Sequence, residues 1–178
     1  MSSNKPGTGG SIARDLMATV NQLNFALTLF AAVGCGLVAG VFFAFSTFVM
    51  KALSRLPTGE GLAVMQSINI AVLNRWFMGV FLGTSAICVL ALVSSLLRWH
   101  EPGGVCLLVG STLYLVGSLL VTALFNVPRN NSLASILPTD PDVANRWADY
   151  LAVWTAWNHV RTAASLAAAV AFSVALGC

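Results

Sequence analysis

Two side chains able to act on a substrate, His159 and Arg161, lie inside a long apolar segment near the carboxyl end of the chain. The segment is long enough to form a helix across the ~30 Å hydrocarbon core of a bilayer, and both residues would lie near its middle. An ionisable group at that depth costs about 3 kcal/mol or more unless it faces a bundle interior or a wet cavity. The pair therefore predicts an internal functional site.

A polar stripe runs along the same segment. Trp154, Asn158, Arg161 and Ser165 follow one another at helical spacing, so they share one face of the predicted helix. The stripe must point into a bundle, because lipid would leave its hydrogen bonds unmade. His159 lies about 100° round the helix from Asn158, near enough to line the same cavity.

Aromatic and amide side chains gather at the ends of other apolar segments, on the side of the two long links. Together with the stripe they would form an aromatic pocket with one titratable base, one fixed cation and several amides. Such a set suits the binding of a flat, apolar, weakly acidic molecule and the stabilisation of its anion. The candidate binding residues are Phe45, Gln66, Asn69, Asn126, Asn130, Trp154 and Trp157.

Each of these residues also has a structural interpretation. Trp154 and Trp157 are typical of the aromatic belt at a membrane interface, and Asn126 and Asn130 could cap a broken helix end. Arg161 could extend its charged group towards the lipid headgroups. The depth of Arg161 in the segment and its place on the inward stripe favour a buried site.

The composition indicates a polytopic membrane protein. The 178 residues are 57% hydrophobic and only 8% charged, whereas soluble domains carry ~25% charged residues. The mean hydropathy is +0.82. The net charge of +3 is small and scattered along the chain, which excludes a nucleic-acid partner. We expect an integral protein of the bacterial cytoplasmic membrane, in contact with the lipid bilayer.

Four apolar segments are long enough to span a bilayer at ~20 residues each, and they predict an all-α membrane bundle of four helices. A tight turn at residues 98–103 joins the second and third spans, so the two long links lie together on the opposite side. The spans cover residues 25–49, 76–97, 104–125 and 150–176, and the long links are 50–75 and 126–149.

Short helices are expected in both long links. Pro57 precedes a helix over residues 60–73, and a second helix begins near Asp142 and leads into the fourth span. Pro128 forces the chain out of helix near Val127, because the residue before a proline disfavours the α region.

The chain is expected to form one membrane domain. A flexible tail and interfacial segment covers residues 1–23, and the four-span domain covers residues 24–178. Residues 1–11 are rich in glycine and serine, a composition typical of disorder.

Pairs of glycines four residues apart indicate close helix packing. Gly36 and Gly40 lie in the first span, and Gly79 and Gly83 lie in the second. Such pairs let two helix backbones approach closely. They could form the contact of a homo-oligomer, but packing within one chain is the commoner use and the one we expect.

The residue types argue against a metal centre and against a thiol-redox site. The four cysteines stand alone in apolar sequence, without a CxxC pair. A metal centre needs several histidine, cysteine or carboxylate ligands, whereas the predicted spans contain His159 and no acid. We therefore expect no metal and no other cofactor.

The same residues resemble the anthrone-oxygenase-like family of small four-span membrane proteins, formerly grouped as a domain of unknown function. The resemblance covers nearly the whole chain beyond residue 25. Fungal members are associated with the oxidation of polyketide anthrones to anthraquinones by dioxygen, without a recognised cofactor. The matching stretches are residues 39–48 (AGVFFAFSTF), 65–69 (MQSIN), 126–130 (NVPRN) and 154–162 (WTAWNHVRT).

The resemblance implies a candidate mechanism for these residues. His159 would remove the acidic methylene proton of an anthrone-like substrate. Arg161 and Asn158 would stabilise the enolate oxygen, with Asn126 or Asn130 assisting, while the tryptophans and phenylalanines stack on the rings. The enolate would then reduce dioxygen, the co-substrate, and a peroxide would collapse to the quinone.

Two other classes of function stay open. A small-solute transporter or channel would also place polar residues within the membrane, although four spans without an internal repeat offer little machinery for alternating access. A non-catalytic accessory membrane protein would use the polar stripe to contact a partner. The sequence leaves open whether the chain is an enzyme, and oxygen uptake with an anthrone would favour that class.

Overall fold

The computed structural model describes residues 8–97 and 103–178, and in these ranges the chain is helical and contains no strand. The predicted all-α class is confirmed. The start of the predicted tail and most of the predicted tight turn lie outside the described residues. The helices are α1 (Thr8–Ala44), α2 (Met50–Leu53), α3 (Thr58–Ala71), α4 (Arg75–Leu97), α5 (Gly104–Tyr114), α6 (Val127–Ala134) and α7 (Val143–Ala175), with π-helical segments η1 (Phe45–Val49), η2 (Leu115–Leu120) and η3 (Thr122–Asn126).

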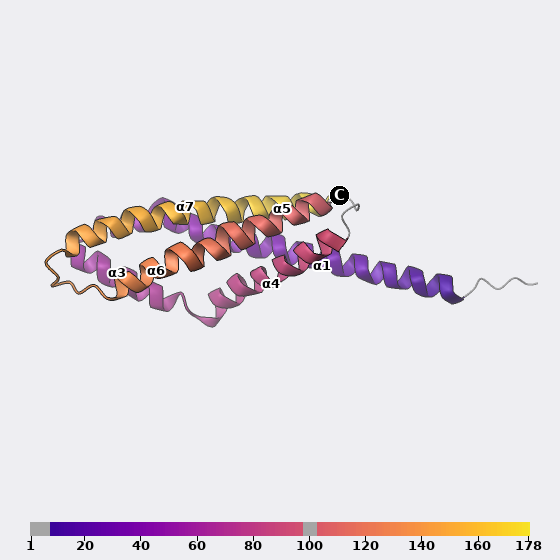
Figure 1. The fold of residues 1–178 in the computed structure, drawn as a ribbon, viewed down its shortest axis with the longest axis horizontal. Helices are drawn as coiled ribbons and strands as arrows, with labels where there is room; N and C mark the ends of the chain where they lie inside the picture. Colours follow the sequence, from indigo (N-terminus) through magenta and orange to yellow (C-terminus); the bar gives the residue numbers. More distant parts are fainter. Residues whose placement is uncertain (1–7, 98–102) are drawn as a thin grey trace, which may run out of the picture.

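The long helices form an elongated bundle (Figure 1). α1 packs against α4 and α7, and α5 packs against the same two helices. α3 and α6 lie together at one end of the bundle, away from the end where α5 begins and the chain terminates. The two long links are therefore on one side, and both predicted link helices are present, since α3 lies in the first link and α7 begins directly after Asp142.

The apolar helices identify an integral membrane protein. Among the described residues, three helical stretches are long and apolar enough to cross a membrane, namely Gly10–Leu53, Arg75–Leu97 and Gly104–Ala134. α7 is not among them, although it has 33 residues. Its polar stripe and small side chains lower the hydropathy of its apolar run. The fourth span therefore stays a prediction.

α1 begins earlier than the first predicted span, which starts at Phe25. Its first residue is Thr8, so residues 8–11 are helical rather than disordered. Residues 10–23 are exposed, and this end of α1 extends beyond the other helices (Figure 1). Good helix formers such as Leu16 and Met17 favour the helix here without tertiary contacts.

The predicted helix break at Pro128 is wrong. η3 runs directly into α6, and Pro128 lies in the first turn of α6. Pro128 removes one backbone hydrogen bond of the helix, and a local π-helical adjustment, such as η3 directly before it, lets a helix continue through a proline. The chain therefore stays helical from Gly104 to Ala134.

The predicted packing role of the two glycine pairs is also wrong. A Cβ atom built on Gly36, Gly40, Gly79 or Gly83 meets no atom within 4 Å, and all four glycines are exposed. The pairs lie on the outer faces of α1 and α4, where their use in a homo-oligomer stays a prediction. Other glycines make the close contacts inside the bundle.

The closest of these contacts with α7 is the one between Gly117 of η2 and Ala164 of α7. A Cβ atom on Gly117 would overlap the Cβ of Ala164, and a methyl group held rigidly by a helix cannot move away without backbone shifts. We expect Gly117→Ala to lower the thermal unfolding temperature in detergent, at a cost of about 1–3 kcal/mol. Gly79→Ala is the matched control, because it adds the same methyl group to an open face of α4. It should leave the temperature unchanged or slightly higher, since alanine favours the helix over glycine. Equal unfolding temperatures for the two variants would contradict this packing.

Candidate functional site

A cavity of about 570 Å³ lies at the α3–α6 end of the bundle. We call it the aromatic cavity, because Phe42, Phe45, Phe77, Phe81 and Trp154 contribute to its wall. Among the described residues, no acidic side chain lines it. Its polar lining residues are Gln66, Asn69, Thr122, Asn126, Asn130, Asn131 and Arg161.

π-helical turns shape two walls of the aromatic cavity. η1 contributes Phe45, and η3 contributes Thr122, Ala123 and Asn126. A π-helical turn holds one more residue than an α-helical turn and is often found at functional sites. Thr122 and Asn126, four residues apart, reach the same wall from this one short segment.

Arg161 is the only charged side chain among the described residues that line the aromatic cavity. It is only 4% exposed. Its guanidinium carbon lies 4.2 Å from the ring centroid of Phe42 and 5.1 Å from that of Trp154. These contacts place the cation between two aromatic rings.

The hydrogen bonds of Arg161 go to neutral groups. One terminal nitrogen donates to Asn158 Oδ1 at 2.6 Å, and the other donates to Thr122 Oγ1 at 3.1 Å. Nε is buried without a hydrogen-bond partner. Arg161 forms no ion pair with any carboxylate among the described residues, so its positive charge stays unpaired within this part of the chain.

Asn158 does not line the aromatic cavity but accepts a hydrogen bond from Arg161. Its side chain is fully buried. Its Nδ2 donates to the Phe42 carbonyl oxygen and to Ser46 Oγ, each at 2.7 Å. Because its nitrogen is committed to α1 and η1, its oxygen is turned to Arg161 and holds the guanidinium in place.

Amide side chains form a second polar group in the aromatic cavity. Asn130 Oδ1 accepts hydrogen bonds from Trp154 Nε1 at 2.7 Å and from the Tyr150 hydroxyl at 2.9 Å. Gln66 Nε2 donates to the carbonyl oxygens of Leu133 and Ile136 at 2.9 and 3.1 Å. These bonds tie α3 to the end of α6 and fix the polar wall.

Asn126 lies between the two polar groups. Its Nδ2 donates to the carbonyl oxygen of Trp154 at 3.2 Å, while its Oδ1 is buried without a partner. A buried amide oxygen without a hydrogen bond costs about 1–3 kcal/mol. A ligand hydroxyl group bound here would remove that cost.

The structure does not bring His159 or Trp157 to the aromatic cavity. His159 is exposed on the outer face of α7. Trp157 stacks on Phe125, with ring centroids 3.7 Å apart and an interplanar angle of 12°. His159 is therefore on the surface, whereas Trp157 is half-buried against η3, outside the lining of the aromatic cavity.

The family of the chain follows from its sequence comparison. The family model described as anthrone oxygenase matches residues 74–171, more than half of the 178 residues. The chain belongs to the anthrone oxygenase family. No curated protein and no solved structure matches the chain.

The anthrone oxygenase match covers much of the aromatic cavity. It runs from the start of α4 through most of α7. The matched segment includes Asn126, Asn130, Trp154 and Arg161, which line the cavity together with Phe45, Gln66 and Asn69 from outside it. The cavity therefore gathers most of the residues that the sequence singles out.

Sequence reasoning missed two side chains that hold the site of this anthrone oxygenase family member. Tyr150 precedes Trp154 by one helical turn and so continues the polar stripe of α7. Thr122 precedes Asn126 by the same spacing. Extending each polar pattern by one turn towards the amino terminus would have found both.

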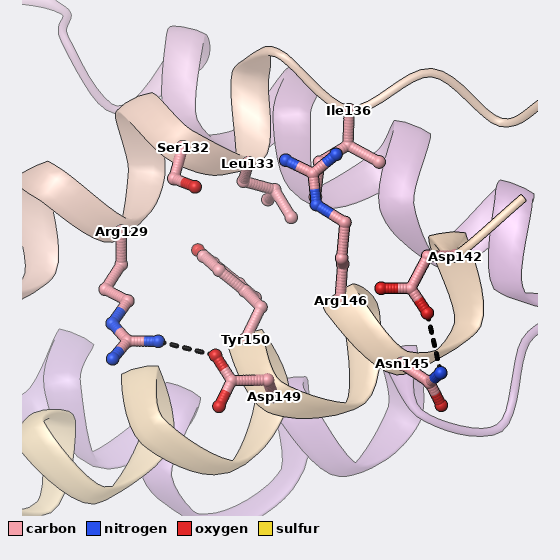
Figure 2. A pocket seen from close by; sticks show the side chains of 9 residues that line it. All are labelled: Arg129, Ser132, Leu133, Ile136, Asp142, Asn145, Arg146, Asp149 and Tyr150. Atoms are coloured by element: carbon pink, nitrogen blue, oxygen red, sulfur yellow. Dashed lines mark hydrogen bonds and ion pairs between the residues drawn. The ribbon is translucent and has the colours of Figure 1, made fainter. Parts of the chain in front are cut away.

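A second, smaller pocket of about 350 Å³ opens at the surface beside the aromatic cavity. Figure 2 shows Arg129 and Arg146 on opposite sides of this surface pocket, with Tyr150 between them. Arg129 pairs with Asp149 at 2.6 Å. Tyr150 also bonds to Asn130 of the aromatic cavity, so its phenol lies in the partition between the two spaces.

Proposed function

We propose that this membrane protein is an oxygenase that oxidises a flat, weakly acidic anthrone-type or phenolic molecule with dioxygen, without a metal or organic cofactor. The observation that carries the proposal is the buried, unpaired cation of Arg161 in a cavity walled by aromatic rings. An anion spread over a planar ring system complements both features. The proposed location is the bacterial cytoplasmic membrane, from which an apolar substrate would enter.

In the proposed mechanism the substrate binds as its enolate. The charge of Arg161 stabilises the enolate oxygen. Arg161 Nε and Asn126 Oδ1 are buried without a partner, and a small shift of the wall would bring them into contact with the bound molecule. The aromatic walls hold the rings flat and exclude water. The substrate loses its methylene proton to water before it binds, so the mechanism needs no side chain as base.

The following steps balance for an anthrone. The electron pair of the enolate carbon forms a carbon–oxygen bond to dioxygen, and the resulting peroxide takes up one proton. Loss of the remaining hydrogen on that carbon as a proton, with cleavage of the oxygen–oxygen bond, leaves a second carbonyl group and releases water. One dioxygen is consumed for each quinone formed, and the substrate supplies all the electrons.

The donor set of the chain supports a reaction without a resident metal. No group of three or more His, Cys, Asp or Glu side chains that could hold a metal ion occurs among the described residues. The polar lining of the aromatic cavity consists of amides, one hydroxyl group and Arg161. These groups suit an oxygen anion better than a metal ion.

Oxygen uptake tests the proposal. Purified protein in lipid nanodiscs, treated with a chelator, should accelerate dioxygen consumption when anthrone is added and form one anthraquinone per dioxygen. Nanodiscs without protein give the rate of spontaneous oxidation. A rate equal to that of empty nanodiscs would overturn the proposed function for this class of substrate.

The exposed position of His159 leads to a prediction about the base role implied by the resemblance. Because His159 faces away from the aromatic cavity, His159→Ala should keep the rate of anthrone oxidation within about twofold of the original, as surface substitutions usually do. Oxygen uptake and the thermal unfolding temperature are the measurements. A large loss of rate with an unchanged unfolding temperature would restore His159 to the mechanism.

A further inference from the structure

The amide of Asn130 has a fixed orientation. Its Oδ1 receives the indole N–H of Trp154 at 2.7 Å and the hydroxyl of Tyr150 at 2.9 Å. An indole N–H can only donate a hydrogen bond, so the atom facing it must be the amide oxygen and not the nitrogen. Two donors occupy both lone pairs of that oxygen, which leaves Nδ2 as the polar group available to a ligand.

Tyr150 is itself held in one position. Its side chain is buried, and its ring stacks on Trp147 with centroids 5.7 Å apart. Asn69 Nδ2 lies 3.5 Å from the Tyr150 oxygen and donates to it. Because a phenol carries one hydrogen, a tyrosine that accepts from Asn69 gives that hydrogen to Asn130.

Arg161 and Asn130 both contact the indole of Trp154. Arg161 lies over the ring of Trp154, and Asn130 is bonded to the N–H edge of that ring. We propose that Tyr150 is a positioning residue, which keeps the Asn130 amide nitrogen turned to the ligand as a second donor to the bound anion beside Arg161. The inference rests on the proposed function, because it assumes an anionic ligand in this cavity.

The competing interpretation is that Asn130 only receives hydrogen bonds and thereby joins α6 to α7. Asn130→Asp separates the two. The carboxylate keeps acceptors for Tyr150 and Trp154 but has no hydrogen to donate to a ligand. Asn131→Asp controls for the added charge, because the neighbouring Asn131 also lines the aromatic cavity but is exposed.

The test uses 1-hydroxyanthraquinone as the probe, since its visible spectrum distinguishes the phenol from the phenolate. Protein in detergent should bind the phenolate at a pH where the free probe is neutral. Asn130→Asp should weaken this binding on the order of 10- to 100-fold, as expected for a donor to a charged oxygen. Tyr150→Phe should weaken it roughly two- to tenfold and reduce the phenolate band of the bound probe.

Tyr114→Phe is the matched control for Tyr150→Phe. It removes the other tyrosine hydroxyl of the chain, which donates to the carbonyl oxygen of Phe81 at 3.1 Å. We expect a similar loss of thermal stability in the two tyrosine variants and a reduced phenolate band only in Tyr150→Phe. Equal bands in Tyr150→Phe and Tyr114→Phe would overturn the role of Tyr150.

The outcomes separate this inference from the proposed function. If Asn130→Asp binds the phenolate no more weakly than Asn131→Asp does, Asn130 is not a donor and the inference is overturned. If that result occurs while Arg161→Met loses the phenolate, the anion site survives and only the second donor is rejected. If the unaltered protein binds no phenolate, the anion site of the proposed function fails, and the inference fails with it.

Discussion

Replacing Arg161 with methionine is expected to slow anthrone oxidation about 100- to 1000-fold, the usual loss when a donor to a developing oxyanion is removed. Arg161 provides the only positive charge among the described residues that line the aromatic cavity. Without it, nothing in this wall offsets the charge of the enolate, and the fraction of substrate bound as the reactive anion falls. Initial rates of dioxygen uptake at saturating anthrone measure the effect.

The same substitution should leave the bundle folded. Arg161 is buried and its hydrogen-bond partners are neutral. Removing one partner of a buried ion pair is costly, because the other charge stays buried and unpaired. A buried charge without such a partner itself lowers stability, because it has lost its hydration. Methionine has a similar length and no charge, and the removal of the unpaired charge offsets the hydrogen bond that Asn158 Oδ1 loses, so we expect an unfolding temperature close to that of the unaltered protein. A variant that unfolds, or one that keeps its oxidation rate, would contradict the role given to Arg161.

The inward stripe of α7 was predictable because two simple rules agree on it. Helical spacing places Trp154, Asn158 and Arg161 on one face, and the lipid penalty turns that face inward. All three are buried. A polar residue in an apolar membrane helix indicates which face of the helix points into the bundle, whereas an apolar residue does not.

The place of His159 was not predictable by the same rules. A residue about 100° from a polar stripe can lie on the edge of a cavity or on the outer surface, and helical geometry allows both. The outcome depends on the width of the packed face. Here η1 and η3 both pack against α7, and the face they cover includes Arg161 but not His159.

Local rules also failed where the backbone departs from the regular α-helix. Pro128 predicts a helix end, but the π-helical segment η3 precedes it and the helix continues. The glycine pairs predict contact, but only the packing of neighbouring helices decides which glycine is covered. Gly117, which belongs to neither pair, makes the close contact because it faces Ala164 across the interface.

Changing Asn158 to aspartate is expected to lower the rate of anthrone oxidation by about 100-fold although Arg161 stays in place, because the oxyanion loses most of the stabilising charge. The Asn158 oxygen accepts from Arg161 at 2.6 Å, so the aspartate would form a buried ion pair with it. A guanidinium neutralised by its own neighbour attracts the substrate anion far less. Dioxygen uptake measures the rate, and the exposed change Asn131→Asp controls for an added negative charge.

The Asn158 variants separate charge from structure. Aspartate keeps the acceptor for Arg161 and loses only the donation to the Phe42 carbonyl and Ser46, so its unfolding temperature should fall modestly. Asn158→Leu removes all of these hydrogen bonds. Each buried polar group left without a partner costs about 1–3 kcal/mol of stability, so Asn158→Leu should be the less stable variant. If the unpaired charge of Arg161 drives the reaction, the more stable aspartate variant loses activity nonetheless. Full activity in the aspartate variant would show that the cation need not be unpaired.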